Sequence, residues 1–295
     1  MLNLTHALVG TLSAASLFVA GSASAVILAQ DSYNGYPGSG GLNGQSGSGE
    51  IGFAAPWSVG TANLQVESGG ILDGDAASGQ GRFIPAGSSS FRSGNRQLSG
   101  VTADPSDNTF YTSHLLNVGT SGGAAGQYAL VGFGTFTNQD TIEGVANFLA
   151  GSFTGYVIQD DGTADLVVRS RTGAAPGVIS DVTVAEDVAG DTVQIVTAID
   201  YNNPSDEVRY WLNPTDFTNG ESGLTTSSLS SGSIPGFQLG AFGDMNRLTV
   251  ATNFSNRSFF WDESTLFTEV SDIPEPASAA LLGLAGLAML RRRSA

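Results

Sequence analysis

The sequence predicts an all-β domain, a β-sandwich of the jelly-roll type, and three observations support that class. The 295 residues include 40 glycines with frequent Ser, Thr and Asn, and few stretches are rich in helix formers. Short segments of alternating apolar and polar side chains recur between turn-forming residues, roughly twelve of them, which is the density of a sandwich. No repeat with a fixed period of 20 to 50 residues is visible, which argues against a solenoid or a propeller.

Residues 1–25 have the features of an export signal, which we expect to form a signal helix. Residues 7–20 are small or apolar, and Ala23 and Ala25 form the A-x-A pattern that signal peptidase cuts. We therefore expect signal peptidase and the general export machinery as partners, with the mature chain beginning at Val26. The segment before the apolar run contains no Lys or Arg, so an uncleaved N-terminal anchor is the alternative.

The sandwich domain is expected to span residues 26–272, and a Gly- and Ser-rich stretch at 31–56 opens it. Low complexity of this kind is typical of a linker. Aromatic residues flank the stretch, with Tyr33 and Tyr36 at one end and Trp57 at the other. These flanks favour a loop pinned to the edge of the sandwich over a free linker.

Alternation of side chains predicts the strands that follow. The clearest strand covers 192–201, where Val193, Ile195 and Ile199 share one face. The sequence Asp160-Asp161-Gly162 predicts a hairpin turn between two strands. The remaining predicted strands are 109–116, 128–136, 153–158, 166–171, 207–212, 247–252 and 258–262.

Three elements follow one another in the tail, residues 273–295: a glutamate between two prolines, an apolar run, and three arginines. They are Pro274, Glu275 and Pro276, then 277–290, then Arg291, Arg292 and Arg293. The prolines stop a helix from extending back into the domain. The apolar run predicts a membrane helix that spans only ~21 Å, against a bilayer core of ~30 Å, and the positive-inside rule places the arginines in the cytoplasm. A buried C-terminal helix is the alternative.

This order of elements resembles the PEP-CTERM sorting signal of Gram-negative bacteria. The resemblance implies recognition by a membrane-embedded exosortase, which processes the tail near the Pro-Glu-Pro motif. It also implies transient anchoring in the inner membrane, followed by delivery to the cell surface or to the exopolysaccharide of a biofilm matrix. The motif specifies a destination and carries no activity.

The charge balance of the chain is strongly acidic. The 11 basic residues are all arginine and face 27 acidic residues, a net charge of −16. Loss of the signal and the tail leaves 8 basic and 26 acidic residues, a net charge of −18. Such a charge excludes a nucleic-acid or anionic-lipid binder. The chain has no cysteine, so neither disulfides nor thiolate chemistry is available, and the core must hold the domain together.

Three stretches of the domain, 43–57, 200–214 and 261–270, carry a second resemblance. They resemble the laminin-G/concanavalin A-like sandwiches found beside PEP-CTERM tails, whose last strand often carries an Asp-Glu pair, as Asp262 and Glu263 do here. The resemblance implies a fold with carbohydrate-binding relatives. We therefore expect a non-enzymatic protein of the cell surface or matrix, whose sandwich packs into or binds extracellular polysaccharide.

The alternative is a secreted glycan hydrolase of the concanavalin A-like class. A retaining pair needs two carboxyl groups ~5 Å apart on one strand face, and the E-x-D-x-x-E pattern of laminarinase-like enzymes is missing. Asp262 and Glu263 are adjacent, so a regular strand would point them to opposite faces. His114 is the single histidine after the export signal, and we expect a packed or surface residue there. We therefore assign no catalytic residue.

Calcium is the one cofactor that the residue types allow. Carboxylate and amide oxygens cluster in the stretches 104–108, 160–165 and 200–206, and calcium prefers such hard oxygen ligands. The candidate ligands are Asp104, Asp107, Asp160, Asp165, Asp200 and Asp206. None of the three stretches has the spacing of an EF-hand loop. Asp and Asn are also ordinary turn residues, so structural turns are the alternative.

Overall fold

The computed structural model describes residues 27–33, 36, 40–47, 50–59, 63–68, 71, 79–85, 92–99, 109–136, 148–172, 178–200, 207–214, 217, 220–224, 231–235 and 246–269. The export signal and the sorting tail, with its membrane helix 277–290, lie outside these ranges. Within them, no helix is long and apolar enough to cross a membrane.

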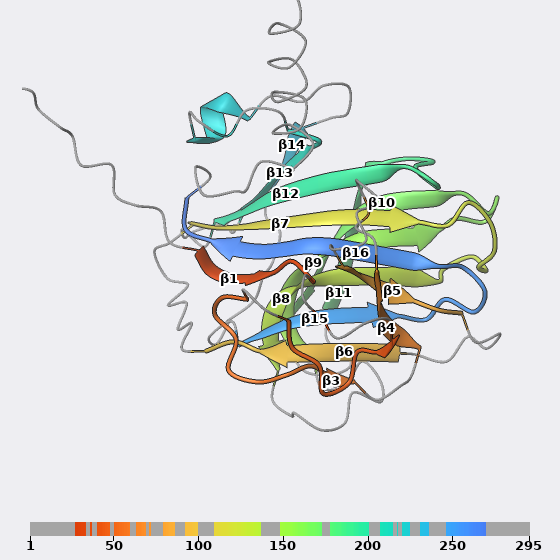
Figure 1. Cartoon of the computed structure of the whole chain (residues 1–295). Helices are drawn as coiled ribbons and strands as arrows, with labels where there is room; N and C mark the ends of the chain where they lie inside the picture. The colour runs from red at the N-terminus through yellow and green to blue at the C-terminus, as the bar shows by residue number, and fades with distance from the viewer. Residues whose placement is uncertain are drawn as a thin grey trace, which may run out of the picture.

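Two antiparallel sheets form the described part of the chain, which confirms the prediction of an all-β sandwich (Figure 1). The larger sheet runs in the order β14 (Ser231–Pro235), β13 (Glu207–Leu212), β12 (Thr192–Asp200), β7 (Thr109–Val118), β16 (Phe259–Phe267), β5 (Gly79–Phe83), β4 (Leu64–Ser68) and β2 (Gly40–Gly41), and β1 (Ile27–Asp31) also pairs with β16. The smaller sheet runs in the order β11 (Val178–Ala185), β10 (Ala164–Thr172), β9 (Phe148–Ile158), β8 (Tyr128–Phe136), β15 (Arg247–Thr252), β6 (Arg92–Gln97) and β3 (Ser58–Val59).

The main core lies between the two sheets, where alternate side chains of each strand meet. Val193, Ile195 and Ile199 of β12 are buried there, as the sequence predicts, and Val131 and Phe133 of β8 lie in the same cluster. Each such side chain contributes roughly 1.5–3 kcal/mol when removed from water. This burial stabilises the two layers without disulfides.

A smaller apolar cluster covers the outer face of the larger sheet. Val196 and Ala198 of β12 pack there with Trp211, Phe217 and Leu224. The covering segment includes a short 3-10 helix, η2 (Gly220–Gly223). Its Glu221 accepts hydrogen bonds from the Tyr111 hydroxyl and from Arg209 Nη2, each at 2.7 Å. Part of this outer face is therefore closed to solvent.

One edge of β16 is shared by two strands. Its first residues, Phe259 to Trp261, pair with β5, and the residues from Ser264 pair with β1. A register shift against β7 marks the change, and Glu263 there has a φ of 47°. The carboxylate of Asp262 accepts the Glu263 N–H at 2.8 Å. The strand therefore passes through a β-bulge and ends at Phe267, beyond the predicted end at 262.

One end of the sandwich carries the first and last described strands, and the opposite end is formed by turns. Ile27 pairs with Phe267, so the first and last described strands meet at one end, on the left of Figure 1. We call this end, formed by Ile27 and 267–269, the terminal pole. The opposite end is formed by the segments 119–127, 159–163, 186–191 and 253–258, which hydrogen bonds join, and we call it the turn pole.

Candidate functional site

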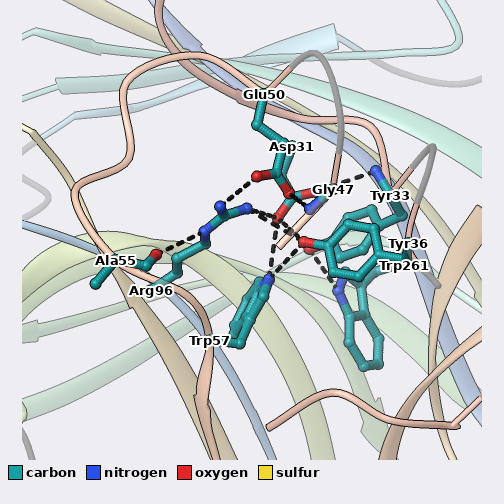
Figure 2. A network of polar contacts seen from close by, with 9 residues as sticks. All are labelled: Asp31, Tyr33, Tyr36, Gly47, Glu50, Ala55, Trp57, Arg96 and Trp261. Carbon is teal, nitrogen blue, oxygen red and sulfur yellow. Dashed lines mark hydrogen bonds and ion pairs between the residues drawn. The ribbon is translucent and has the colours of Figure 1, made fainter. Parts of the chain in front are cut away.

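A buried polar network joins the N-terminal segment to the rest of the sandwich (Figure 2). Arg96 of β6, which is 3% exposed, lies at its centre. Its Nη1 donates to Asp31 Oδ2 at 2.9 Å, its Nη2 pairs with Glu50, and its Nε donates to the Ala55 carbonyl at 3.1 Å. Its guanidinium also lies 4.2 Å from the centre of the Phe53 ring. Its Nη1 also donates to the Tyr36 hydroxyl at 3.2 Å, so this one side chain contacts five residues of the N-terminal segment.

Three aromatic residues complete the hydrogen bonding of Asp31. The Tyr36 hydroxyl donates to Asp31 Oδ2 at 2.8 Å, and Trp57 Nε1 donates to the same oxygen at 3.0 Å. The Tyr33 N–H donates to Asp31 Oδ1 at 3.0 Å. The Tyr33 hydroxyl in turn accepts from Trp261 Nε1 of β16 at 2.8 Å. The aromatic flanks of 31–56 are therefore pinned to both sheets.

Burial sets the charge states in this network. It raises the pKa of Asp31, although the Arg96 guanidinium acts in the opposite direction. Burial also raises the pKa of Tyr33 and of Tyr36 far above the usual range, so both phenols stay neutral. These side chains are buried or nearly so. The network's role is therefore to fasten the fold.

A solvent-open pocket of about 480 Å³ lies at the turn pole. Its volume is within the range of ~300–1,000 Å³ that small-ligand pockets occupy. Among the described residues, seven line it and five of these are acidic: Gln159, Asp160, Asp161, Thr163, Asp165, Glu186 and Asp187. We take this acidic pocket as the candidate functional site.

The hairpin between β9 and β10 forms one side of the acidic pocket, at the turn that the sequence predicts. Gly162 has a φ of 86°, which suits glycine. Asp161 Oδ1 accepts the Thr163 N–H at 2.9 Å and the Thr163 hydroxyl at 2.7 Å. These hydrogen bonds hold the pKa of Asp161 below its usual value. Asp161 is therefore ionised at neutral pH.

The turn between β11 and β12 forms the other side. Asp165, which is 8% exposed, accepts the Asp187 N–H at 3.1 Å through its Oδ1. The Val188 N–H donates to the Ala164 carbonyl at 3.0 Å. Behind the hairpin, the buried Arg257 donates from Nη2 to the Gly162 carbonyl at 2.9 Å. The turns that carry the carboxylates are therefore held to the sandwich by hydrogen bonds.

The acidic pocket offers hydrogen-bond acceptors and negative charge, and none of its described lining residues is basic. A glycosidase acid needs a carboxyl group with a raised pKa. Burial raises the pKa of Asp31 and of Asp262, but neither residue lines the pocket. Its carboxylate and amide oxygens are hydrogen-bond acceptors that suit a ligand rich in hydroxyl groups.

The predicted calcium residues are separated by the fold. Asp160 and Asp165 lie together in the acidic pocket, whereas Asp200 ends β12 opposite Thr109, with its Oδ2 3.4 Å from Arg209 Nη1. Asp104, Asp107 and Asp206 lie outside the described residues. Within the described ranges, no group of three or more His, Asp or Glu is placed to hold a metal ion. Calcium binding stays a prediction.

His114 lies in the core, at 1% exposure, with its ring centre 5.7 Å from that of Phe133. Its Nδ1 is 3.1 Å from Ser264 Oγ, and burial lowers its pKa to about 3. The ring is therefore neutral and closed to substrate. This position agrees with the expectation of a packed or surface residue.

Sequence reasoning missed three pocket residues, Gln159, Glu186 and Asp187, and the centre of the network. Glu186 and Asp187 follow β11, which the sequence analysis did not single out, although its alternating pattern offers a signal. Arg96 is 65 positions from Asp31. An arginine in a polar strand gives no local sign that it will be buried.

Comparison with known proteins gives matches of low similarity. No protein-family model matches the chain, and no curated protein matches it. A carbohydrate esterase from the Shiga toxin-encoding bacteriophage phi24B is 16% identical, with a TM-score of 0.44, over 72% of this chain and 89% of that one. The carbohydrate recognition domain of Emp47p is 9% identical, with a TM-score of 0.40, over 70% of this chain and 89% of that one. A legume lectin-like domain from Entamoeba histolytica is 11% identical, with a TM-score of 0.41, over 69% of this chain and 89% of that one.

These TM-scores are all below 0.5, so the likenesses establish neither a family nor a function. The sandwich architecture rests on the two sheets of the chain itself.

Proposed function

We propose that this protein is an exported, non-enzymatic protein of the cell surface or the exopolysaccharide matrix, sorted through its C-terminal tail. The observation that carries the proposal is the fixed order of the Pro-Glu-Pro motif, the apolar run 277–290 and the three arginines. The export signal at 1–25 supports it independently, because its features do not depend on those of the tail.

The proposed route has two processing steps. Signal peptidase removes residues 1–25 after Ala25, while the apolar run holds the other end in the inner membrane. At ~21 Å that run is short for a bilayer core of ~30 Å, so its anchoring is marginal and suits a transient stay. An exosortase-type enzyme then processes the tail near Pro274 and Pro276, and the protein passes to the surface or matrix of a Gram-negative-type bacterium.

The tail is tested by replacing Pro274, Glu275 and Pro276 with alanine in a host that has the sorting enzyme. We expect insertion to continue and processing to stop, because a helix can then run through the site that the enzyme needs extended. Fractionation and a size assay follow the unprocessed chain into the inner membrane. Replacing Ser271 and Asp272 with alanine is the matched control and leaves processing unchanged. Surface delivery of the triple-alanine variant at the wild-type level would refute the sorting signal.

The sandwich is proposed to contact extracellular polysaccharide through the acidic pocket. Sugar hydroxyl groups donate hydrogen bonds to carboxylate and amide oxygens, and these are what the pocket presents. Its opening to solvent would admit a unit of a long polymer. The net negative charge of the chain favours neutral or cationic glycans over acidic ones.

A glycan array tests this contact. We expect Asp161→Asn combined with Glu186→Gln to abolish binding, because each change removes a charged acceptor from the pocket. The matched control is Glu67→Gln, which removes an equivalent carboxylate on β4 that pairs with Arg82 at 2.6 Å. Equal binding by the pocket variant and the wild type would exclude the pocket as the contact site.

The second candidate is a secreted glycan hydrolase, and the observation that favours it is the presence of several carboxylates in one pocket. It predicts new reducing ends when polysaccharides are incubated with the protein. It also predicts that this activity is lost in the pocket variant and retained in Glu67→Gln. Binding without release of reducing ends would decide for the non-enzymatic function.

A further inference from the structure

Both ends of the sandwich chain leave the fold at the same pole. Ile27 is paired with Phe267 and Ala29 with Leu266, so the start of the first strand, β1, lies beside the end of the last strand, β16 (Figure 1). The export signal precedes Ile27 by two residues, and the sorting tail begins four residues after Glu269. Any membrane segment at either terminus is therefore attached to the terminal pole.

The acidic pocket lies at the turn pole, near the start of β16. β16 begins at Phe259, next to Arg257, whose Nη2 donates to the Gly162 carbonyl of the pocket hairpin at 2.9 Å. The strand has nine residues, and at ~3.3 Å per residue this separates the two poles by about 30 Å.

The tether between fold and membrane is at most about as long as this separation. Seven residues, 270–276, lie between Glu269 and the first residue of the apolar run, Ala277, so eight Cα–Cα steps join them. Even fully extended, eight steps reach about 29 Å. An inverted sandwich, with its turn pole against the bilayer, would therefore need the tether at its full extension.

Electrostatic repulsion between the pocket carboxylates and the bilayer favours the same orientation as the short tether. The described residues that line the pocket of the turn pole include five carboxylates and no basic side chain. A bilayer surface with anionic lipids repels such a pole.

We propose that the tail-anchored protein stands on its terminal pole and presents its turn pole, with the acidic pocket, as the surface available to the matrix. This orientation rests on the proposed membrane anchoring by the tail. It holds for a cleaved export signal and for a retained N-terminal anchor, because both leave the fold beside Phe267. The terminal pole is correspondingly the face toward the processing enzyme.

The chain has no cysteine, so single cysteines report on each pole without background. Ala125→Cys places a thiol on an exposed turn of the turn pole, and Glu269→Cys places one on the exposed end of the terminal pole. The full-length chain is produced in a host without the sorting enzyme, which keeps the tail attached. Isolated membranes, and the same membranes dissolved in detergent, are then treated with a polyethylene-glycol maleimide.

We expect Ala125→Cys to react at the same rate in membranes and in detergent. The thiol of Glu269→Cys should react at least about five times more slowly in membranes than in detergent, because the short tether holds it near the bilayer. Comparing each variant with itself removes differences in intrinsic thiol reactivity.

Two outcomes overturn the proposal in distinguishable ways. Equal slowing of both thiols in membranes, or of neither, would refute the orientation while leaving tail anchoring intact. Recovery of the full-length chain outside the membrane fraction would refute the anchoring, and the orientation with it.

Discussion

At the scale of single residues, the Arg96 network decides how strongly the N-terminal segment is held. Arg96 and Asp31 are 4% and 0% exposed at their side chains, whereas Arg82 and Glu67, a comparable pair, are 30% and 36% exposed. Removing one partner of a buried pair leaves the other charge desolvated, which costs about 3–5 kcal/mol. Exposed pairs contribute about 0–1 kcal/mol.

We therefore expect Arg96→Met to lower the free energy of unfolding by about 3–5 kcal/mol, because Asp31 and Glu50 lose their shared cation. Denaturant titration measures the change. Arg82→Met is the matched control and should lose about 1 kcal/mol or less. Similar losses in the two variants would show that burial does not set the strength of the Arg96 pair.

His114 gives a second test at this scale, through pH. Burial lowers its pKa to about 3, from the usual histidine value of 6.5. Between these values the unfolded state binds more protons than the folded state, so stability falls as the pH falls. We expect His114→Phe to remove about 2 kcal/mol of the stability difference between pH 7 and pH 5. Asp31 and Asp262 contribute equally to the pH dependence of stability in the wild type and in the variant. A pH dependence that is unchanged in His114→Phe would contradict the buried neutral ring.

At the scale of elements, alternation located eight of the described strands, missed β1 to β6, β11 and β14, and did not place every end. The pattern of 192–201 matches β12 to within one residue, because each residue of one face is buried in the core. β16 runs past the predicted end at 262 and ends at Phe267. In the fold, the positive φ of Glu263 forms a bulge and the strand continues.

Close contact between β5 and β16 leads to a prediction about a single glycine. A Cβ on Gly81 would lie 2.1 Å from Cε2 of Trp261. We expect Gly81→Ala to cost about 1–3 kcal/mol by overpacking, together with a change in tryptophan fluorescence. Gly41→Ala is the matched control, because no atom lies within 4 Å of its added Cβ. A Gly81→Ala variant as stable as that control would place the Trp261 ring elsewhere.

At the scale of the whole molecule, the sequence indicated the acidic pocket only in part. The carboxylates of the 160–165 turn are local in sequence and could be recognised there. Glu186 and Asp187 reach them through the pairing of β10 with β11, which no local pattern specifies. The same limit applies to Tyr33 and Trp261, which are 228 positions apart and joined by a hydrogen bond. Such contacts follow from the order in which the strands pair, which the local patterns of a sequence do not reveal.

The closure of the sandwich by its first and last strands carries the final prediction. β1 covers half of one edge of β16, and Asp31, Tyr33 and Tyr36 fasten it through the Arg96 network. A mature chain that begins at residue 37 lacks all of these contacts and leaves that edge with unpaired backbone groups. We expect its cooperative thermal unfolding to shift to a much lower temperature.

A peptide of residues 26–36 should restore the missing strand by pairing with the open edge. Its binding to the folded state stabilises the shortened chain by about 2.7 kcal/mol at a hundred times the dissociation constant. The control peptide carries Asp31→Asn, which keeps the shape but loses the charge that Arg96 requires, so its rescue should be weaker. Unfolding at the wild-type temperature without peptide, or equal rescue by both peptides, would show that β1 and Asp31 do not close the fold.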